Sequence, residues 1–146
     1  MDTWPMSSAN LDLVRSIFAA WERGDFSSVD WADPEIEFVV ADGTSPGEWK
    51  GLAEMTASWL SVLNAYDDFR SVAEEYRELD DGRILVLLTF RGRGRASALE
   101  IADIAPRAAN LLNVRDGKVT KLIIWWNRDL AFADLGLAPD TGSPDS

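Results

Sequence analysis

Apolar residues recur every three or four positions in two stretches of the chain, which is the spacing of one helix face. The first stretch contains Leu11, Val14, Ile17, Phe18 and Trp21. It predicts a helix over about residues 8–23 that Gly24 would end. The second stretch follows Gly51 and contains Leu52, Met55, Trp59 and Val62 or Leu63. It predicts a second long helix.

Elsewhere the apolar period is two, which predicts strands. The expected strands cover residues 35–41, 69–79, 83–95, 106–115 and 118–127, and Asp81-Gly82 and Asp116-Gly117 are hairpin signals between the later ones. We expect a short helical turn over 25–31, a loop over 42–47, a short helix within 128–137 and a disordered acidic tail over 138–146. Helices that precede an antiparallel sheet make an α+β domain over residues 1–137.

Length and charge narrow the function classes. The 146 residues fit one domain, and 14 basic against 25 acidic residues give a net charge of −11, which disfavours binding to nucleic acid. The chain has no Cys and no His, which excludes disulfides, His-dependent triads and imidazole- or thiolate-bound metals. No apolar run approaches the length of a membrane span and the N-terminus lacks a signal core, so we expect a cytoplasmic protein that does not insert in membranes.

Three segments resemble the SnoaL-like polyketide cyclases of the nuclear transport factor two-like superfamily. They are "RSIFAAWERGDFSSVDWADPEIEF", "EWKGLAEM", and "NVRDGKVTKLIIWWN" followed by "LAFADLGL". The resemblance covers almost the whole chain and implies a cone-shaped α+β fold, in which a curved mixed or antiparallel sheet wraps around helices. It also implies a cavity between the concave sheet face and the helices. Members of the superfamily include enzymes and proteins with no chemistry.

The family's usual register, combined with the period of two, assigns one side of each strand to the cavity. The inward set is Ile84, Val86, Leu88, Phe90, Ala108, Asn110, Leu112, Leu122, Ile124 and Trp126. A slip of one residue would exchange the two faces.

The opposite, outward set is too apolar to be left in water. It includes Leu85, Leu87, Ile123 and Trp125. We expect a homodimer that buries this face in a two-fold contact. The alternative is that the C-terminal segment or a helix covers it in a monomer.

The catalytic groups of characterised relatives are missing from the matching positions. Where the resemblance implies the Asp-Arg-Asp set of the epoxide hydrolases, the sequence has Leu88, Phe90 and Ile124. The isomerase base falls near Val39, and Asn127 stands at the usual acidic position of the last segment.

Three polar residues remain as catalytic candidates. Asp42 lies in the loop at the expected cavity mouth, where it would be a gate or base unless it is an ordinary turn residue. Tyr76 would share a strand face with Glu74, and a buried carboxylate beside a phenol could act as acid or base. Solvated edge-strand charges are the alternative for that pair. Asn110, among apolar neighbours, would orient a ligand carbonyl or serve as a structural amide.

Seven Trp residues favour a pocket for a flat apolar ligand. Trp21, Trp59 and Trp126 come from three elements that would wall one cavity, and Trp49 is a candidate lid. Trp4 and Trp31 are expected at the surface or in ordinary packing. The full set of predicted ligand-binding residues is Trp21, Trp49, Trp59, Leu88, Phe90, Leu112, Leu122, Ile124 and Trp126.

The sequence therefore predicts a SnoaL-like protein that binds a small hydrophobic or aromatic molecule in an apolar cavity. If it is an enzyme, the resemblance implies cyclase, isomerase or hydrolase chemistry without a metal or cofactor. The alternative is a non-catalytic ligand-binding or dimeric interaction protein. The segment Arg91-Gly92-Arg93-Gly94-Arg95 is similar to RNA-binding Arg-Gly segments, but without interleaved aromatic residues it favours ion pairs with neighbouring acids such as Glu74, Glu75 or Glu100.

Overall fold

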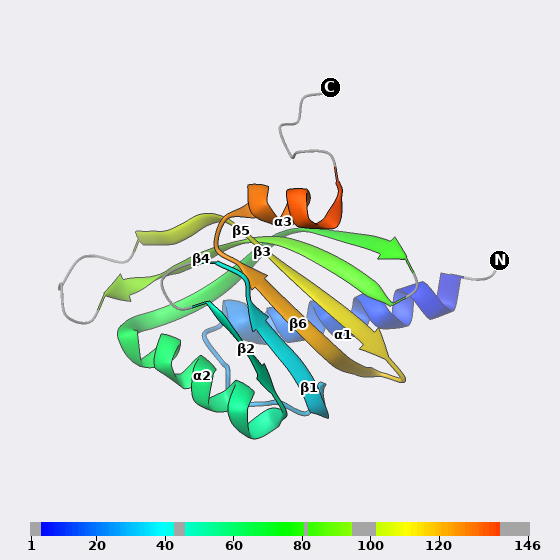
Figure 1. Ribbon diagram of the computed structural model, residues 1–146, viewed down its shortest axis with the longest axis horizontal. Coiled ribbons are helices and arrows are strands. Elements are labelled where there is room, and N and C mark those ends of the chain that lie inside the picture. Colours follow the sequence, from blue (N-terminus) through cyan, green and yellow to red (C-terminus); the bar gives the residue numbers. More distant parts are fainter. Residues whose placement is uncertain (1–3, 43–45, 81, 95–101, 138–146) are drawn as a thin grey trace.

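Six strands form one curved sheet with helices on both faces (Figure 1). The computed structural model describes residues 4–42, 46–80, 82–94 and 102–137. The elements in chain order are α1 (Trp4–Glu22), β1 (Ala32–Val40), β2 (Gly47–Lys50), α2 (Leu52–Ala65), β3 (Tyr66–Asp80), β4 (Arg83–Gly94), β5 (Ala102–Arg115), β6 (Lys118–Trp125) and α3 (Arg128–Leu135). None of the helices in these ranges is long and apolar enough to cross a membrane.

The strand order is β2-β1-β6-β5-β4-β3, and every neighbouring pair is antiparallel except β1 and β6, which are parallel. The sheet is therefore mixed, and the expected α+β cone is confirmed. The parallel pair brings the first strand of the chain beside the last one. Phe38 of β1 pairs with Leu122 of β6, and Leu122 pairs in turn with Leu112 of β5.

The alternation of apolar residues divides the core into two layers, as the period of two predicts. The inner face packs against α1 and α2, and its buried strand residues include Ile36, Phe38, Ile84, Val86, Leu88, Phe90, Ala108, Leu112, Leu122 and Ile124. Trp126 packs on the same layer and Asn110 is fully buried. The predicted inward register is confirmed.

The outer layer is covered within the single chain by α3. Leu85, Leu87 and Trp125 are at most 2% exposed and pack with Ala131 and Phe132 of that helix. The exposed apolar face on which the homodimer was argued is thus largely buried by the chain itself, the alternative that the sequence left open. Whether the protein dimerises stays a prediction.

Arg128, the first residue of α3, fastens this helix to the sheet. Its guanidinium is buried and donates to the carbonyl oxygens of Ala108 and Leu88, each at 3.1 Å. It also pairs with the Glu74 carboxylate at 2.9 Å, and the Thr89 hydroxyl donates to the same carboxylate at 2.6 Å. A cation that is desolvated among three acceptors holds the helix in one position.

The prediction that Glu74 and Tyr76 share a strand face is wrong, because β3 has a β-bulge at Glu74. Ala73 pairs with Leu88 and Glu75 with Leu87, so Glu74 is the extra residue on its strand. The bulge turns Glu74 to the outer face, where it meets Arg128, while Tyr76 points to the inner layer. The two side chains therefore do not share a face. Glu75 pairs with Arg77 on the outer side at 2.6 Å.

Two local predictions differ from the structure. Residues 25–29 form no helical turn, because the Asp25 carboxylate accepts from the Ser27 N–H at 3.1 Å and its hydroxyl at 2.7 Å, a local bond that competes with a helix. Residues 47–50 form β2, which the sequence placed at the end of a loop; its short length gives too few positions for an alternating signal. The side chains of Arg93 and Trp4, and all of Arg95, Glu100 and 138–146, lie outside the described parts.

Candidate functional site

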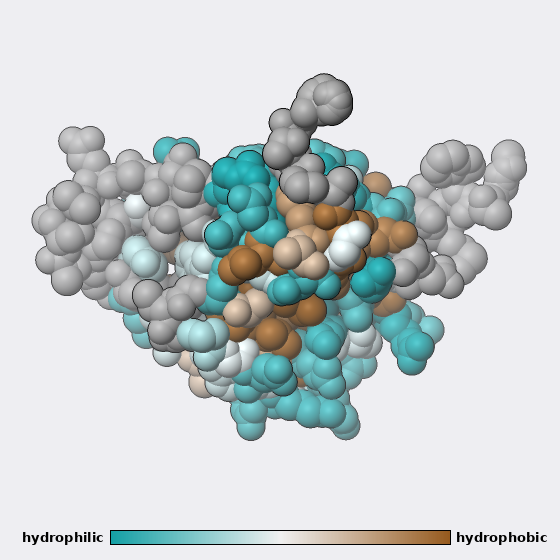
Figure 2. Space-filling model, turned by 45° about the horizontal axis from the view of Figure 1, so that its top comes forward, coloured by the Kyte–Doolittle hydropathy of each residue, from teal (hydrophilic) through white to brown (hydrophobic). Residues whose placement is uncertain are grey.

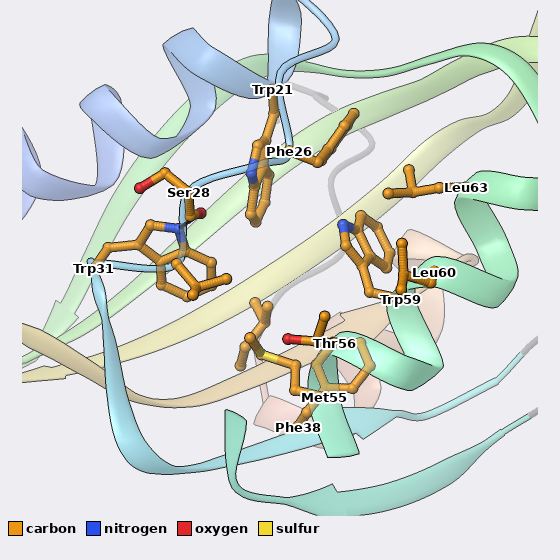
Figure 3. A pocket seen from close by; sticks show the side chains of 12 residues that line it. Trp21, Phe26, Ser28, Trp31, Phe38, Met55, Thr56, Trp59, Leu60 and Leu63 are labelled. Atoms are coloured by element: carbon orange, nitrogen blue, oxygen red, sulfur yellow. Dashed lines mark hydrogen bonds between the residues drawn. The ribbon is translucent and has the colours of Figure 1, made fainter. Parts of the chain in front are cut away.

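An apolar pocket opens between the end of α1, the loop that follows it, α2 and the strands β1 and β6 (Figure 3). Aromatic rings make most of its wall, and they come from segments far apart in the chain. Its lining residues are Trp21, Phe26, Ser28, Val29, Trp31, Phe38, Met55, Thr56, Trp59, Leu60, Leu63 and Leu122.

The loop after α1 is shaped by hydrogen bonds rather than by regular structure. Gly24 has a φ of +81°, a conformation that ends the helix at little cost for glycine. The Trp31 indole N–H donates to the carbonyl oxygen of Ser28 at 3.0 Å, and the Ala32 N–H donates to Val29 at 3.0 Å. These bonds fix Trp31 against the pocket.

Asp25 contributes to the same loop as an ionised group. The hydrogen bonds from the Ser27 hydroxyl and N–H, with the nearby Arg23 charge, outweigh a small desolvation and lower the pKa of its carboxyl. The carboxylate is fully exposed, so its part is to set the turn and to add negative charge beside the pocket.

Three pairs of rings around the pocket meet at steep angles, whereas Trp21 lies closer to parallel with Phe26, at 26°. Trp21 and Trp31 have centroids 5.8 Å apart with an interplanar angle of 77°, and Phe26 and Trp59 are 5.7 Å apart at 66°. Phe38 and Trp59 are 6.3 Å apart at 75°. Edge-to-face contacts of this kind are the favourable ones for aromatic pairs, so the rings support each other around the opening.

The pocket is narrow. Its enclosed volume is about 50 Å³, within an open space of about 460 Å³ that includes the mouth. An apolar cavity of roughly 150 Å³ is known to hold benzene. A benzene-sized group therefore enters this pocket only when its rings move apart.

Polar groups are scarce in the wall. Ser28 and Thr56 carry hydroxyls, and none of the lining residues within the described part of the chain has an ionisable side chain. A hydrophobic wall with a few polar points is typical of small-molecule sites.

A second, shallower hollow lies next to this pocket and shares Trp21, Ser28 and Trp31 with it. Two carboxylate residues, Asp25 and Asp30, border the hollow. The Lys118 amino group is held close by through a hydrogen bond to the Asp30 carbonyl oxygen.

Of the predicted ligand-binding residues, Trp21, Trp59 and Leu122 line the pocket. The others lie in the surrounding core and do not border it: Trp49, Leu88, Phe90, Leu112, Ile124 and Trp126. Trp49 packs on Phe38 with ring centroids 5.7 Å apart. The ring of Trp126 contacts Phe90 at 4.8 Å, so it belongs to the same aromatic cluster without forming a third wall.

Asp42 is bound to the backbone at the end of β6. One carboxylate oxygen accepts the N–H of Trp126 at 2.6 Å and the other accepts the N–H of Asn127 at 3.0 Å. Asn127, at the usual acidic position of the last segment, also has a structural role. Its side chain caps α3 by accepting the Asp129 N–H at 3.0 Å.

Tyr76 is half-buried between two side chains of α1. Its ring meets Phe18 edge-on at 6.1 Å, and the Arg15 guanidinium lies 4.8 Å from the ring centre. Burial, with a smaller contribution from the Glu22 carboxylate, raises the pKa of the Tyr76 hydroxyl, although Arg15 opposes the rise. The hydroxyl is therefore protonated near neutral pH.

Asn110 is fully buried, and neither its amide oxygen nor its amide nitrogen has a hydrogen-bond partner. It shares one row of the sheet with Tyr76, because both residues pair with Val86, from opposite sides. Two strand spacings separate them, roughly 10 Å, so Tyr76 and Asn110 do not form a hydrogen-bonded pair. The three catalytic candidates are not gathered around the pocket, since none of them lines it.

Sequence reasoning missed most of the wall. Phe26, Val29 and Trp31 lie in an irregular loop, where no period shows which way a side chain points. Phe38, Met55 and Leu63 do follow the strand and helix periods, and the buried side of each element was available as a signal. Among the described residues, no group of three or more acidic, His or Cys side chains is placed to hold a metal ion.

The family is decided by a sequence comparison. Residues 14–122 match the sequence model of the SnoaL-like domain. The chain belongs to the SnoaL-like family. An uncharacterised protein of Mycobacterium tuberculosis strain H37Rv, Rv0034, is 29% identical over 117 residues, which cover 78% of this SnoaL-like chain and 86% of the relative.

Solved structures agree on the SnoaL-like fold. TerC, co-crystallised with polyporic acid, superposes with a TM-score of 0.66 at 21% identity and covers 87% of this chain and 97% of its own. A protein from Catenulispora acidiphila with a ketosteroid isomerase-like fold, in complex with trimethylamine, has a TM-score of 0.64 at 13% identity, with coverages of 87% and 94%. Identities this low show the fold alone.

Proposed function

We propose that this SnoaL-like protein binds a small hydrophobic molecule, or the compact hydrophobic end of a larger one, in the pocket between α1 and α2. The observation that carries the proposal is the wall itself: Trp21, Phe26, Trp31, Phe38 and Trp59 surround a narrow space that opens to solvent (Figure 3). Such a wall gains free energy from any apolar surface that displaces water from it.

The proposed role is binding without chemical conversion. General acid–base catalysis needs an ionisable side chain within hydrogen-bond reach of the ligand. The described residues of the wall offer the Ser28 and Thr56 hydroxyls and no ionisable side chain. The predicted alternative, a non-catalytic ligand-binding protein, is therefore the function that this pocket favours.

Cyclase, isomerase or hydrolase activity remains the competing proposal, with Asp42, Tyr76 and Asn110 as its residues. The occupied hydrogen bonds of the Asp42 carboxylate and the distance between Tyr76 and Asn110 speak against their acting together. The TerC and Catenulispora complexes support ligand binding as a use of this fold, and they assign no ligand to this chain.

Calorimetric titration with three small apolar probes tests the proposal: 3,3-dimethyl-1-butanol, toluene and indole. We expect saturable binding of at least one of them with a negative heat-capacity change, because apolar surface is buried. Trp59→Leu should weaken that binding at least tenfold.

Trp125→Leu is the matched control, since it makes the same exchange in the outer layer, and it should leave affinity within threefold. Circular dichroism checks that both variants fold. If no probe binds, or if both variants lose affinity equally, the pocket is not the binding site.

Turnover separates binding from catalysis. Each bound probe, and a panel of terpenoid epoxides and steroids, should be recovered unchanged after incubation with the protein. A product whose formation is lost in Asp42→Asn or Tyr76→Phe, with binding retained, would instead establish the enzyme.

The expected homodimer also belongs among the proposals. Around α3 some apolar side chains remain at the surface: Leu130 is 44% exposed, and Ile123, Leu135 and Leu137 are partly exposed (Figure 2). We propose that a second copy packs on this smaller patch.

A further inference from the structure

The aromatic pocket combines three properties that together specify a charge on its ligand. Its rings face a common space, its polar groups are few, and negative charge lies beside it. The inference drawn from them rests on the proposed function, because it names the chemical class of the molecule bound at the same site.

The first property is the arrangement of the rings. An ammonium group is attracted to an aromatic face when it lies within about 6 Å of the ring centre. Trp21 and Trp31 meet at 77° with centroids 5.8 Å apart, and Phe38 and Trp59 meet at 75° with centroids 6.3 Å apart. At such angles and separations, one cation in the corner between two rings lies within that distance of both. Figure 3 shows Trp21, Trp31 and Trp59 around one central space, with Phe38 below it.

The second property is the lack of hydrogen-bond acceptors. A primary ammonium has three N–H donors that need partners when it is buried. The wall supplies the hydroxyls of Ser28 and Thr56, and the Ser28 carbonyl already accepts the Trp31 indole. A fully methylated ammonium has no N–H group, so it makes no such demand and presents methyl groups to the rings.

The third property is electrostatic. The chain has a net charge of −11, and the ionised carboxylate of Asp25 lies with Asp30 in the hollow that adjoins the pocket. Two basic groups lie at the same hollow, because the Arg23 charge acts on the Asp25 carboxylate and Lys118 donates to the Asp30 carbonyl, so the surplus of negative charge is that of the whole chain. Of the residues that the structure describes, no Lys or Arg lines the pocket. A negative field of this kind raises the local concentration of small cations.

We propose that the ligand of this pocket carries a methylated ammonium group, which the rings of Trp21, Trp31, Phe38 and Trp59 enclose. A trimethylammonium group is about as bulky as a benzene ring, so it enters the interior of about 50 Å³ only as the rings move apart, while the open mouth accommodates the rest of the molecule. The group is the same whether it belongs to a free small molecule or to a lipid head group.

A pair of molecules of almost equal shape isolates the charge. Choline and 3,3-dimethyl-1-butanol differ in having nitrogen or carbon at the centre of three methyl groups, so calorimetric titration of both measures the contribution of the positive charge. We expect choline chloride and tetramethylammonium chloride to bind about tenfold more tightly than the neutral alcohol. Sodium chloride at matched concentration is the reference.

Variants of one ring test the mechanism. Trp59→Phe keeps an aromatic face and should retain choline affinity within threefold, whereas Trp59→Leu should lose the tenfold preference for choline over the alcohol. Trp125→Leu in the outer layer should leave the preference unchanged.

The outcomes distinguish this inference from the proposed function. Equal affinity for choline and the alcohol, or binding of indole without choline, overturns the cation and leaves the hydrophobic pocket standing. Failure of every probe overturns both. Co-sedimentation with phosphatidylcholine vesicles, competed by free choline, supports the ammonium group and assigns it to a lipid. Co-sedimentation that choline does not reduce, together with no choline binding in solution, overturns it.

Discussion

Asn110 places a polar amide among apolar neighbours. It lies in the middle of the sheet between Val86 and Ile124, and both polar atoms of its amide are buried without partners. An unsatisfied buried polar group costs about 1–3 kcal/mol. A residue that destabilises the fold in this way is a candidate for function, because stability is commonly given up where a polar group is needed.

Replacing Asn110 with Leu should therefore stabilise the protein. Leucine has the same branched shape without polar atoms, so we expect the free energy of unfolding to rise by about 1–3 kcal/mol in urea denaturation. Binding in the tryptophan pocket should not change, since Asn110 does not line it. A loss of stability would mean that the amide has partners in solution, such as ordered water.

At the scale of single residues, the sequence predicted some residues of the pocket wall but not the role of Asp42. Trp21, Trp59 and Trp126 were predicted to wall the cavity that the family resemblance implied, and Trp21 and Trp59 line the pocket. Asp42 was chosen as a carboxylate near a cavity mouth, but its two hydrogen bonds to the backbone just after β6 depend on a parallel strand pair that no local pattern reveals. Contacts across such distances in the chain are invisible to periodicity.

At the scale of the elements, an ion pair between Arg128 and Glu74 holds helix α3 to the sheet. Desolvation alone would raise the pKa of Glu74, but the hydrogen bonds from Thr89 and Arg128, with the Arg128 charge, outweigh it and lower that pKa. A carboxyl whose pKa is lower in the folded than in the unfolded state stabilises the fold above its unfolded pKa. That contribution is lost as the pH falls through the folded value.

Glu74→Gln should consequently lower the melting temperature at pH 7 and have little effect in acid. The difference from the parent protein should be constant well above pH 4.5, the ordinary value for this carboxyl, and should close as the pH falls through the lowered pKa. Differential scanning calorimetry between pH 7 and the acid limit of solubility measures it.

Glu35→Gln, a change at an exposed position of β1, is the control for this series and should shift the melting temperature little at any pH. A Glu74→Gln effect that persists undiminished in acid would contradict the role of the ionised pair.

Elements with a clear period were predicted well and irregular ones were not. The inward register of Val86, Leu88 and Phe90 followed from alternation together with the family's usual register, because alternation gives two faces without saying which is the inner one. The segment with Phe26 and Trp31 has no period, since the Asp25 side chain and the Trp31 indole bond to the nearby backbone. The bulge at Glu74 likewise shifted a face that simple alternation had assigned.

At the scale of the whole molecule, helix α3 and the apolar surface around it bear on how two copies of the chain would associate. The helix covers Leu85, Leu87 and Trp125, which a bare sheet would have exposed. Apolar side chains remain at the surface around this helix (Figure 2), and Leu130 is 44% exposed. An apolar patch of this kind is a common site of association between identical chains.

We predict a dimer of the 16.2 kDa chain in sedimentation velocity at micromolar concentration. Leu130→Asp should shift the population to monomer without changing the circular dichroism spectrum, because the side chain is exposed in the single chain. Leu60→Asp, at an equally exposed leucine of α2, is the control and should leave the dimer intact. A parent protein that sediments as a monomer would show that α3 alone is sufficient cover.

The adjacency of β1 and β6 has a consequence for how the protein is made. Phe38 is synthesised before Leu122, yet these two residues pair across the sheet and both line the pocket. A nascent chain that lacks β6 has the Trp side chains of the pocket but not its Leu122 wall. The complete pocket can therefore bind a molecule only after β6 has been synthesised.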